Sequence, residues 1–345
     1  SFGDSAYLEE EANSWTLNSS TSLRWWDGRD SDAGSSFLFF SYLEDKLGGA
    51  SGIRQLVSNP SLGGNGIESL ARNPGPGSTP VGTSMSEVFA NFSAAVTLDS
   101  AQGAFGFSNL DLVDDCSNGG ICKASISAEN DQWSEAWQSS GHSVEGWGLR
   151  SFRFTQGDGF PLSIMVQPDR FGFEGVVLSK ADGSGTWTME ELRIDSSDGR
   201  GTGLVHGFGN TTSEVLLLVW YNSLVDDCDF DFANCGVLSG GNYPSGSFTV
   251  SASQVTSPAE VAIGSISSFD RDGDFLDDSV EIGVSVSSSA FSETLSVEFS
   301  AFTNNSLHDS AEFIVSVGNS EPEILSVWFT PPFTSDWSFT AKVRD

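Results

Sequence analysis

An acidic loop near the C-terminal end of the chain has the residue spacing of a calcium site. Asp270, Asp272, Asp274, Asp278 and Glu281 take positions 1, 3, 5, 9 and 12 of a twelve-residue stretch. Calcium loops bind their cation through carboxylate oxygens at this spacing. Without a cation, carboxylates this close together would repel one another. The sequence therefore predicts that these five side chains bind calcium, and a solvated acidic turn is the alternative.

The predicted calcium loop departs from the helix-loop-helix type of site. Position 6 is Phe275, where that type has a glycine for its sharp turn. The flanking segments alternate like strands, not like helices. The loop therefore resembles the calcium loops of extracellular repeat and sandwich proteins.

A second acidic cluster surrounds a cysteine. Asp226, Asp227, Asp229 and Asp231 lie on both sides of Cys228. They could bind a second calcium ion, but an acidic loop closed by a disulfide is the simpler interpretation.

The four cysteines form two close pairs along the sequence, and we expect two local disulfides, Cys116–Cys122 and Cys228–Cys235. Closing so short a loop stabilises a fold by about 2 kcal/mol. A four-cysteine zinc site is the alternative, but it would need the closer C-x2-C spacing. Disulfides indicate an oxidising compartment, and four N-x-S/T sequons agree with it. We therefore expect an extracellular or cell-surface protein.

The charge balance argues against several classes of partner. The 345 residues include 15 Lys and Arg against 47 Asp and Glu, a formal charge of −32. Nucleic-acid binding draws most of its affinity from basic side chains, so we expect no nucleic-acid partner. Docking on anionic lipid is disfavoured for the same reason. No apolar run reaches the ~18 residues of a membrane span.

The apolar period changes near residue 100. Residues 1–99 have the 3.6-residue period of helices, with a predicted helix at 35–47 and a capping box that starts another at Ser84. From residue 100 onward, alternating segments between Gly, Asp and Ser turns predict strands. The glycine-rich stretch 199–203 is expected to be a turn.

These patterns predict a multidomain chain of class α plus all-β. The predicted parts are a helical region at 1–99, a disulfide-stapled β-sandwich at 100–255, and an immunoglobulin-like β-sandwich with the calcium loop at 256–345, complete or truncated.

Four segments of the helical region carry a resemblance to a known family. They are Leu8-Glu9-Glu10-Glu11-Ala12, the stretch 34–43 (GSSFLFFSYL), Ile53-Arg54-Gln55-Leu56-Val57, and Val88-Phe89-Ala90-Asn91-Phe92. In this order they resemble the secreted zinc metallopeptidases of the immune inhibitor A and hyicolysin type, within the gluzincin group. The resemblance covers about 100 residues, and no single segment is specific alone. It implies that residues 1–99 are the helical C-terminal subdomain of a metallopeptidase-like domain.

The resemblance implies a zinc ligand. Glu10 is best placed to be the third zinc ligand of the intact parent protein, and Glu9 is the second choice. The residues themselves suggest a simpler role, because the helix dipole favours acidic side chains in a first turn.

Two features of that family are absent from this sequence. No H-E-x-x-H occurs, and His142, His206 and His308 are too scattered to replace it. Ala33 stands where the family often has Tyr or His, which puts a donor to the oxyanion in question. We therefore expect no catalytic residue in this chain, no activity of the chain alone, and zinc only in the intact parent.

The leading interpretation is the C-terminal portion of a secreted, calcium-stabilised zinc metallopeptidase. As a piece of a longer protein, it would have a protein or peptide as the substrate of its parent. The alternative is a non-catalytic extracellular surface or adhesion protein with a degenerate peptidase remnant. The reading frame just upstream of Ser1 would distinguish the two.

Overall fold

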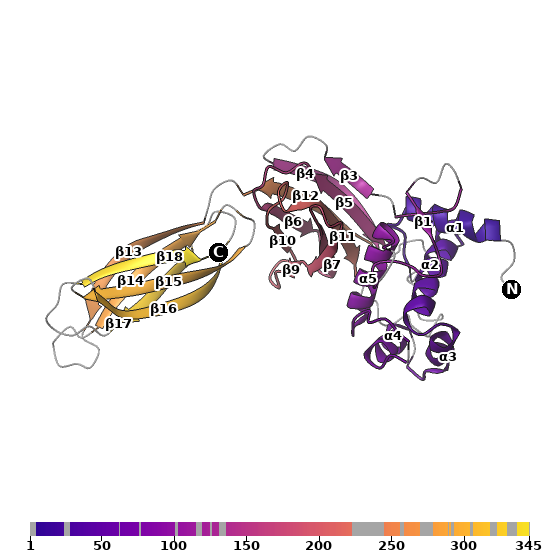
Figure 1. The fold of residues 1–345 in the computed structure, drawn as a ribbon, viewed down its shortest axis with the longest axis horizontal. Coiled ribbons are helices and arrows are strands. Elements are labelled where there is room, and N and C mark those ends of the chain that lie inside the picture. The colour runs from indigo at the N-terminus through magenta and orange to yellow at the C-terminus, as the bar shows by residue number, and fades with distance from the viewer. Residues whose placement is uncertain are drawn as a thin grey trace.

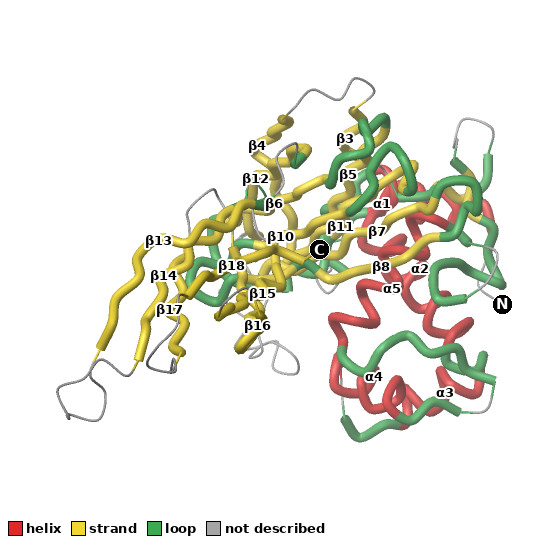
Figure 2. Tube along the Cα trace, turned by 60° about the vertical axis from the view of Figure 1, so that its left-hand side comes forward, coloured by secondary structure: helices red, strands yellow, loops and turns green. Residues whose placement is uncertain are grey.

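The computed structural model has a helical region followed by largely antiparallel β-sheets, as the sequence predicts (Figures 1 and 2). The helices lie at one end of the molecule and the last sheets at the other (Figure 1). The structure describes residues 5–23, 28–61, 63–75, 77–100, 103–114, 119–124, 126–130, 136–222, 245–255, 259–269, 279–288, 290, 293–303, 306–317, 323–329 and 337–344.

The helices of the described N-terminal region are α1 (Ser5–Leu17), α2 (Asp30–Lys46), α3 (Ala50–Ser58), α4 (Gly63–Arg72) and α5 (Met85–Leu98). The capping box of α5 is confirmed. Ser84 Oγ accepts a hydrogen bond from the Glu87 backbone N–H (3.2 Å), and the Glu87 carboxylate accepts one from the Ser84 N–H (3.3 Å). Two N–H groups that a helix start leaves unpaired are thereby satisfied.

Two helix predictions were incomplete. Helix α2 starts at Asp30 and not at Ser35, because the carboxylate of Asp32 accepts the Arg29 backbone N–H (3.0 Å) and closes an earlier first turn. Helix α4 was not predicted, since its glycine-rich start has low helix propensity. Its apolar side chains Ile67, Leu70 and Ala71 are buried at helical spacing, so tertiary packing outweighs propensity here.

The middle of the chain forms a β-sandwich. Its described strands are β3 (Ile126–Asn130), β4 (Ala136–Glu145), β5 (Leu149–Thr155), β6 (Leu162–Pro168), β7 (Phe173–Ala181), β8 (Trp187–Glu191), β9 (Arg193–Ile194), β10 (Gly201–Val205), β11 (Thr212–Tyr221) and β12 (Ser245–Gln254). One sheet has the order β4-β12-β6-β10-β9 and the other β3-β5-β11-β7-β8, with β3 parallel to β5. Two short strands, β1 (Leu112–Val113) and β2 (Ile121–Cys122), pair in parallel beside the helices.

The prediction of a turn at 199–203 was wrong for most of that stretch. Residues 201–205 form strand β10, which pairs with β6 and β9. A Cβ at Gly203 would meet side-chain carbons of Val177 and Leu192 at 3.0 and 3.1 Å. Glycine is therefore used here for close packing within the sandwich.

The helical layer and the sandwich share a core. One face of the β3-β5-β11-β7-β8 sheet contributes Leu149, Val176, Leu178, Leu216, Leu218 and Trp220, which cluster with helix side chains such as Phe89 and Phe92. The opposite face packs against the other sheet. Each fully buried side chain of this size stabilises the fold by roughly 1.5–3 kcal/mol. The sheet face and the helices are thus held as one unit.

The C-terminal strands form two further sheets with a core of their own. They are β13 (Glu260–Phe269), β14 (Ser279–Ser287), β15 (Glu293–Thr303), β16 (Ser306–Val317), β17 (Glu323–Phe329) and β18 (Trp337–Arg344), in the orders β13-β14-β17 and β16-β15-β18. Alternate residues of β14 and β15, among them Ile282, Val284 and Phe299, are buried between the sheets. The predicted domain boundaries at 99/100 and 255/256 stay predictions.

Candidate functional site

Three consecutive glutamates of α1 differ sharply in their surroundings. The side chain of Glu10 is exposed and that of Glu9 is half-buried, whereas Glu11 is only 3% exposed. Among the described residues, the buried Oε2 atom of Glu11 has no hydrogen-bond partner. A buried carboxylate oxygen without a partner is costly, because it loses its hydration without compensation.

Close packing of α1 against α2 buries Glu11. A Cβ at Gly34 of α2 would lie 1.9 Å from the backbone oxygen of Glu11, so only glycine permits this approach. The neighbouring Ala12 and Trp15 are fully buried on the same helix. Tyr7, one turn earlier and exposed, has its pKa raised chiefly by a side-chain hydrogen bond to Glu11 and by the charge of that carboxylate.

A network of ion pairs joins the start of α2 to the sandwich. The guanidinium of Arg29 donates to both carboxylate oxygens of Glu145, at 3.0 and 2.9 Å. The same group lies 3.2 Å from Asp32, which is 1% exposed. Glu145 also accepts the backbone N–H of Ser22 at 2.8 Å. Bidentate charge-assisted bonds of this kind fix orientation, so they position the α1–α2 pair on the sandwich.

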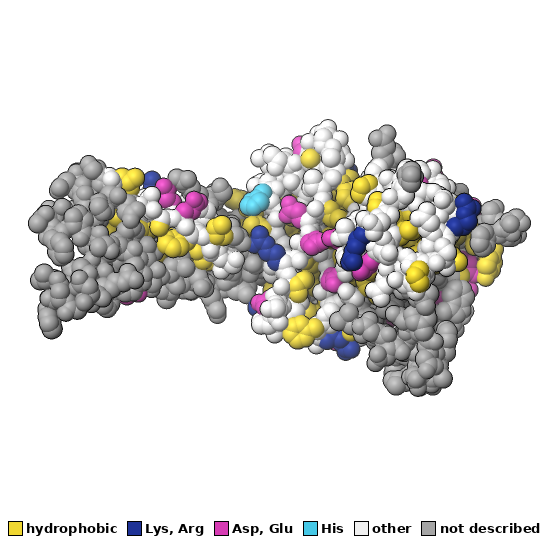
Figure 3. All heavy atoms as spheres, turned by 90° about the horizontal axis from the view of Figure 1, so that it is seen from below, with side chains coloured by type: hydrophobic (Ala, Val, Ile, Leu, Met, Phe, Trp, Pro, Cys, Tyr) yellow, Lys and Arg dark blue, Asp and Glu magenta, His cyan; other side chains and the backbone are white. Residues whose placement is uncertain are grey.

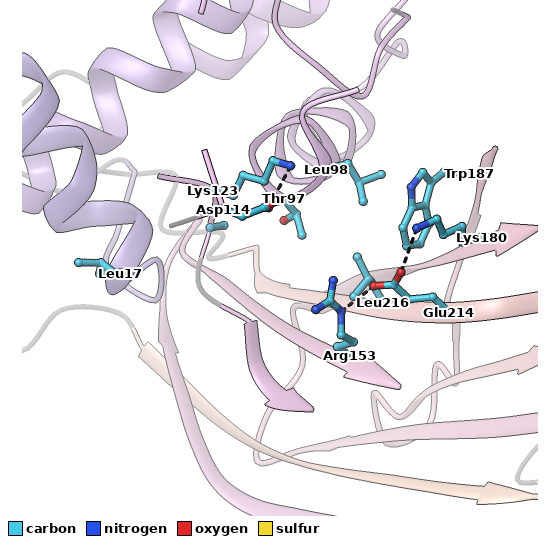
Figure 4. Close-up of a pocket in the computed structure, with 11 residues that line it drawn as sticks. Leu17, Thr97, Leu98, Asp114, Lys123, Arg153, Lys180, Trp187, Glu214 and Leu216 are labelled. Atoms are coloured by element: carbon cyan, nitrogen blue, oxygen red, sulfur yellow. Dashed lines mark hydrogen bonds and ion pairs between the residues drawn. The ribbon is translucent and has the colours of Figure 1, made fainter. Parts of the chain in front are cut away.

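A second candidate site is a cleft of about 620 Å³ at the C-terminal end of α5 (Figure 4). Its charged lining consists of Asp114 and Lys123 near β1 and β2, and of Arg153, Lys180 and Glu214 on the sheet. In Figure 4 the Arg153 and Lys180 side chains converge on Glu214 from two sides.

The charged floor of this cleft continues an apolar sheet face. On β11 the residues Leu218 and Leu216 face the helices, and Glu214 is next on that face because side chains alternate with period 2. Pairing between strands sets Glu214 opposite Lys180 and Lys180 opposite Trp187. The face therefore changes from apolar to charged where the cover of α5 ends.

Ion pairs connect the charged side chains of the cleft. Arg153 Nε and Lys180 Nζ lie 2.6 and 3.3 Å from the two oxygens of Glu214, whose side chain is 12% exposed. Lys180 Nζ also lies 5.4 Å from the centre of the Trp187 ring. Lys123 Nζ lies 3.1 Å from Asp114, which is 87% exposed.

The opposite end of α5 has the opposite charge. A smaller cleft of about 290 Å³ there is lined by Glu87, Glu174 and Glu191. Hydrogen bonds from Thr83 and Ser84, with the Thr83 backbone N–H foremost, lower the pKa of Glu87. Acidic groups at a helix N-terminus and basic groups at its C-terminus both complement the helix dipole, so the charges at the two ends of α5 also stabilise the helix.

The predicted calcium site falls largely outside the described residues. Asp270, Asp272, Asp274 and Asp278 are among the residues that the structure does not describe. Glu281 lies in β14 and alternates with the buried Ile282, so it is on the face away from the core. Phe269 pairs with Ser279, so the predicted loop connects the ends of two antiparallel strands.

The structure describes one of the four cysteines that are predicted to form disulfides. Cys122 ends strand β2, is 1% exposed and is disulfide-bonded. Cys116, Cys228 and Cys235 lie outside the described residues, as does the acidic cluster Asp226, Asp227, Asp229 and Asp231. The pairing of the four cysteines therefore stays a prediction.

The histidines have separate environments. His142 of β4 packs against Phe152 and Phe248, with ring centroids 4.8 and 5.5 Å apart, and its Nε2 lies 2.8 Å from Ser139 Oγ. Burial, assisted by the charge of Arg150, lowers the pKa of His142. His206 is exposed after β10, and His308 lies in β16.

The described part of the chain has neither a group of metal-binding side chains nor a helix suited to a membrane. No three His, Cys, Asp or Glu side chains are grouped there in a way that could bind a metal ion. No helix in that part is long and apolar enough to cross a membrane.

Comparisons with known proteins assign no family. No protein-family model and no curated protein matches the chain. The solved structures that are similar include a periplasmic inhibitor of g-type lysozyme from Escherichia coli, at 12% identity and a TM-score of 0.21, covering 36% of this chain and 96% of that one. A surface-associated copper-binding protein, CorA of Methylomicrobium album BG8, has 10% identity, a TM-score of 0.23, and coverage of 37% and 98%. A β-galacturonidase from Eisenbergiella tayi has 15% identity, a TM-score of 0.19, and coverage of 59% and 32%. At these scores the likeness assigns neither fold nor function.

Proposed function

We propose that this chain is the C-terminal portion of a secreted, calcium-stabilised zinc metallopeptidase of the immune inhibitor A and hyicolysin type. The observation that carries the proposal is the buried carboxylate of Glu11, which has an oxygen without a partner among the described residues. It lies on the helix that the resemblance equates with the helix of the third zinc ligand. A cation beside that oxygen would offset the cost of its burial.

The residues of this chain could supply only one ligand of a zinc site. Its described part groups no three metal-binding side chains, and the whole sequence has no H-E-x-x-H. We therefore propose that the chain supplies one carboxylate and that the two imidazoles come from residues it does not contain. When bound, zinc would supply a Lewis acid and an acidified water. The role of this chain is to hold the carboxylate in place through the packing of α1 on α2.

Within α1, burial favours Glu11 over its neighbour. Adjacent helical residues point about 100° apart, so Glu10 and Glu11 cannot both face the same site. The resemblance predicts Glu10 as the zinc ligand, and that prediction is untested. We propose Glu11 as the ligand instead, since its side chain is buried against the helix pair and that of Glu10 is exposed.

Proteolysis by the natural full-length protein tests the proposed function. We expect it to cleave casein in a reaction that a zinc chelator stops, and we expect purified residues 1–345 to cleave none. An inert full-length protein would favour the non-catalytic surface or adhesion protein. Chelator-sensitive cleavage by residues 1–345 alone would contradict the shared zinc site.

Calcium and extracellular location belong to the same proposal. The connection between β13 and β14 holds most of the predicted ligands, and it joins the ends of a paired hairpin, where a bound cation would fix both strands. We also propose that the cysteines form the two local disulfides and that the last two sheets form an immunoglobulin-like domain. The substrate of the parent protein would be a protein or peptide.

A further inference from the structure

One side chain connects helix α1 to a segment far along the chain. The amide of Asn13 donates through Nδ2 to the backbone oxygen of Gly120 at 3.0 Å. Its Oδ1 accepts the backbone N–H of Cys122 at 2.7 Å. Both polar atoms of one amide are thus paired with a single short segment, which fixes α1 against strand β2. We call these two hydrogen bonds the Asn13 contact.

Strand β2 is anchored in turn to helix α5. The backbone N–H of Ala124, just after β2, donates to the backbone oxygen of Val96 in α5 at 3.0 Å. β2 pairs with β1, where the N–H of Leu112 donates to the carboxylate of Asp99, the C-cap of α5, at 2.7 Å. In Figure 1, β1 lies beside α1. The Asn13 contact therefore connects α1, through β2, to the helix that packs on the sandwich.

A covalent crosslink belongs to the same segment. Cys122 is 1% exposed and disulfide-bonded, and its N–H is the one that Asn13 accepts. Gly120 has a φ of +95°, in the region that favours glycine. A crosslink reduces the number of conformations open to such a segment. It therefore favours the conformation in which the Gly120 oxygen and the Cys122 N–H both face Asn13.

Attraction between charges is a poor alternative anchor for α1. Residues 5–17 include three glutamates and no Lys or Arg, in a protein with a formal charge of −32. On the face shown in Figure 3, the described Lys and Arg side chains are a few separate spots among Asp and Glu side chains. A helix of 13 residues is also marginal without tertiary contacts. The position of α1 therefore depends on packing and on uncharged contacts such as that of Asn13.

We propose that the disulfide of Cys122 fixes the position of α1 through Asn13, so that the helix is fully held only after the cysteines are oxidised. Oxidation joins the two sulfurs, and two electrons and two protons pass to an acceptor disulfide, which becomes a dithiol. In a secreted protein this step follows export from the reducing cell interior.

The consequence for zinc rests on the proposed function. Asn13 follows Glu11 by two residues on the same helix, so whatever holds α1 also holds the Glu11 carboxylate. Asn13 is a positioning residue in this scheme, because it acts on Glu11 only through the helix. Before export the reduced chain would hold this ligand loosely, and the zinc site would be completed outside the cell.

Hydrogen exchange of residues 1–345, followed by mass spectrometry, tests the proposal without zinc. We expect Asn13→Ala and Cys122→Ser each to speed exchange of the α1 amides about tenfold, with α4 unchanged. Asn73→Ala is the matched control, since its exposed amide donates only to Ser69 at the end of α4, and it should leave α1 unchanged. Circular dichroism of each variant confirms that the fold is retained.

Combining the changes distinguishes a shared contact from separate losses of stability. The double variant Asn13→Ala/Cys122→Ser should exchange no faster in α1 than the faster single variant, because both changes remove the same contact. Reduction of the natural chain by dithiothreitol should reproduce the faster α1 exchange, and it should add nothing in the Asn13→Ala variant. This arm needs no substitution at the buried cysteine.

Three results would overturn the proposal. They are unchanged α1 exchange after reduction, additive effects in the double variant, and equal acceleration in α1 and α4. In the natural full-length protein, Asn13→Ala should also raise the zinc Kd about tenfold, and an unchanged Kd would remove the positioning role. A zinc-free natural protein would contradict the proposed function and leave the exchange results standing, whereas unchanged α1 exchange would leave zinc binding standing.

Discussion

Glu11 occupies an apolar position of its helix. Leu8, Glu11, Ala12 and Trp15 lie at positions i, i+3, i+4 and i+7, which is one face of an α-helix. This spacing is visible in the sequence and would have favoured Glu11 over Glu10. The family resemblance instead places Glu10 at the ligand position. What the sequence could not show is that the carboxylate oxygen lacks a partner, since this depends on how α2 packs.

Replacing Glu11 by an apolar residue of similar size should stabilise the chain in the absence of zinc. We expect Glu11→Met to raise the free energy of unfolding by about 1–3 kcal/mol, since an apolar side chain removes the cost of the buried charge. Urea unfolding measures the change. Glu10→Met is the matched control and should stay within about 0.5 kcal/mol. Equal effects of the two variants would contradict the difference in burial.

His142 should make stability depend on pH. Its pKa is lowered in the folded protein from an ordinary value of 6.5, chiefly by burial. The unfolded chain therefore binds a proton more readily, and the stability contributed by neutral His142 is present above pH 6.5 and is lost as pH falls through the lower folded value. We expect His142→Gln to reduce the loss of stability in that window, measured by urea unfolding at several pH values. An unchanged pH dependence would show that the ring is not desolvated.

At the scale of elements, the α1–α2 contact depends on one glycine. Gly34→Ala would place a methyl group at 1.9 Å from the Glu11 backbone oxygen, so the two helices must separate. We expect a loss of about 1–3 kcal/mol in the free energy of unfolding, as for other overpacked contacts. Alanine is otherwise the better helix former. Ser36→Ala on the same helix is the control, and a Gly34→Ala variant as stable as that control would contradict the close contact.

Elements with strong local signals were predictable, and those formed by packing were not. Ser84 and Glu87 identified the start of α5 because a capping box is local. Helix α4 and strand β10 were missed because glycines obscured their patterns, and neighbours such as Leu192 explain those glycines only in the folded structure. The cleft was missed for a related reason. Arg153, Lys180 and Glu214 are far apart in sequence, and only strand pairing brings them together.

At the scale of the whole molecule, calcium should stabilise the C-terminal sheets. A cation that binds only the folded loop adds roughly 2.7 kcal/mol at a hundred times its Kd. We expect millimolar calcium to raise the melting temperature of the C-terminal sheets. Magnesium should be a poor substitute because it requires a tighter octahedron of ligands. Scanning calorimetry at matched ionic strength measures this.

Variants of the loop connect that effect to its predicted ligands. Asp272→Asn and Asp274→Asn should remove most of the rise, while Asp182→Asn, an exposed aspartate in the β7–β8 turn, should retain it. If calcium does not change the melting curve, the loop is a solvated acidic turn and not a calcium site.

Zinc stoichiometry tests the central claim most directly, because the shared zinc site is what connects this chain to a peptidase. The natural full-length protein should contain one zinc per chain by elemental mass spectrometry. Glu11→Gln should lower the zinc affinity about tenfold or more, as loss of a ligand does, and Glu10→Gln should leave it unchanged. A zinc-free natural protein, or a Glu11→Gln variant that binds zinc as tightly as the natural protein, would contradict the account.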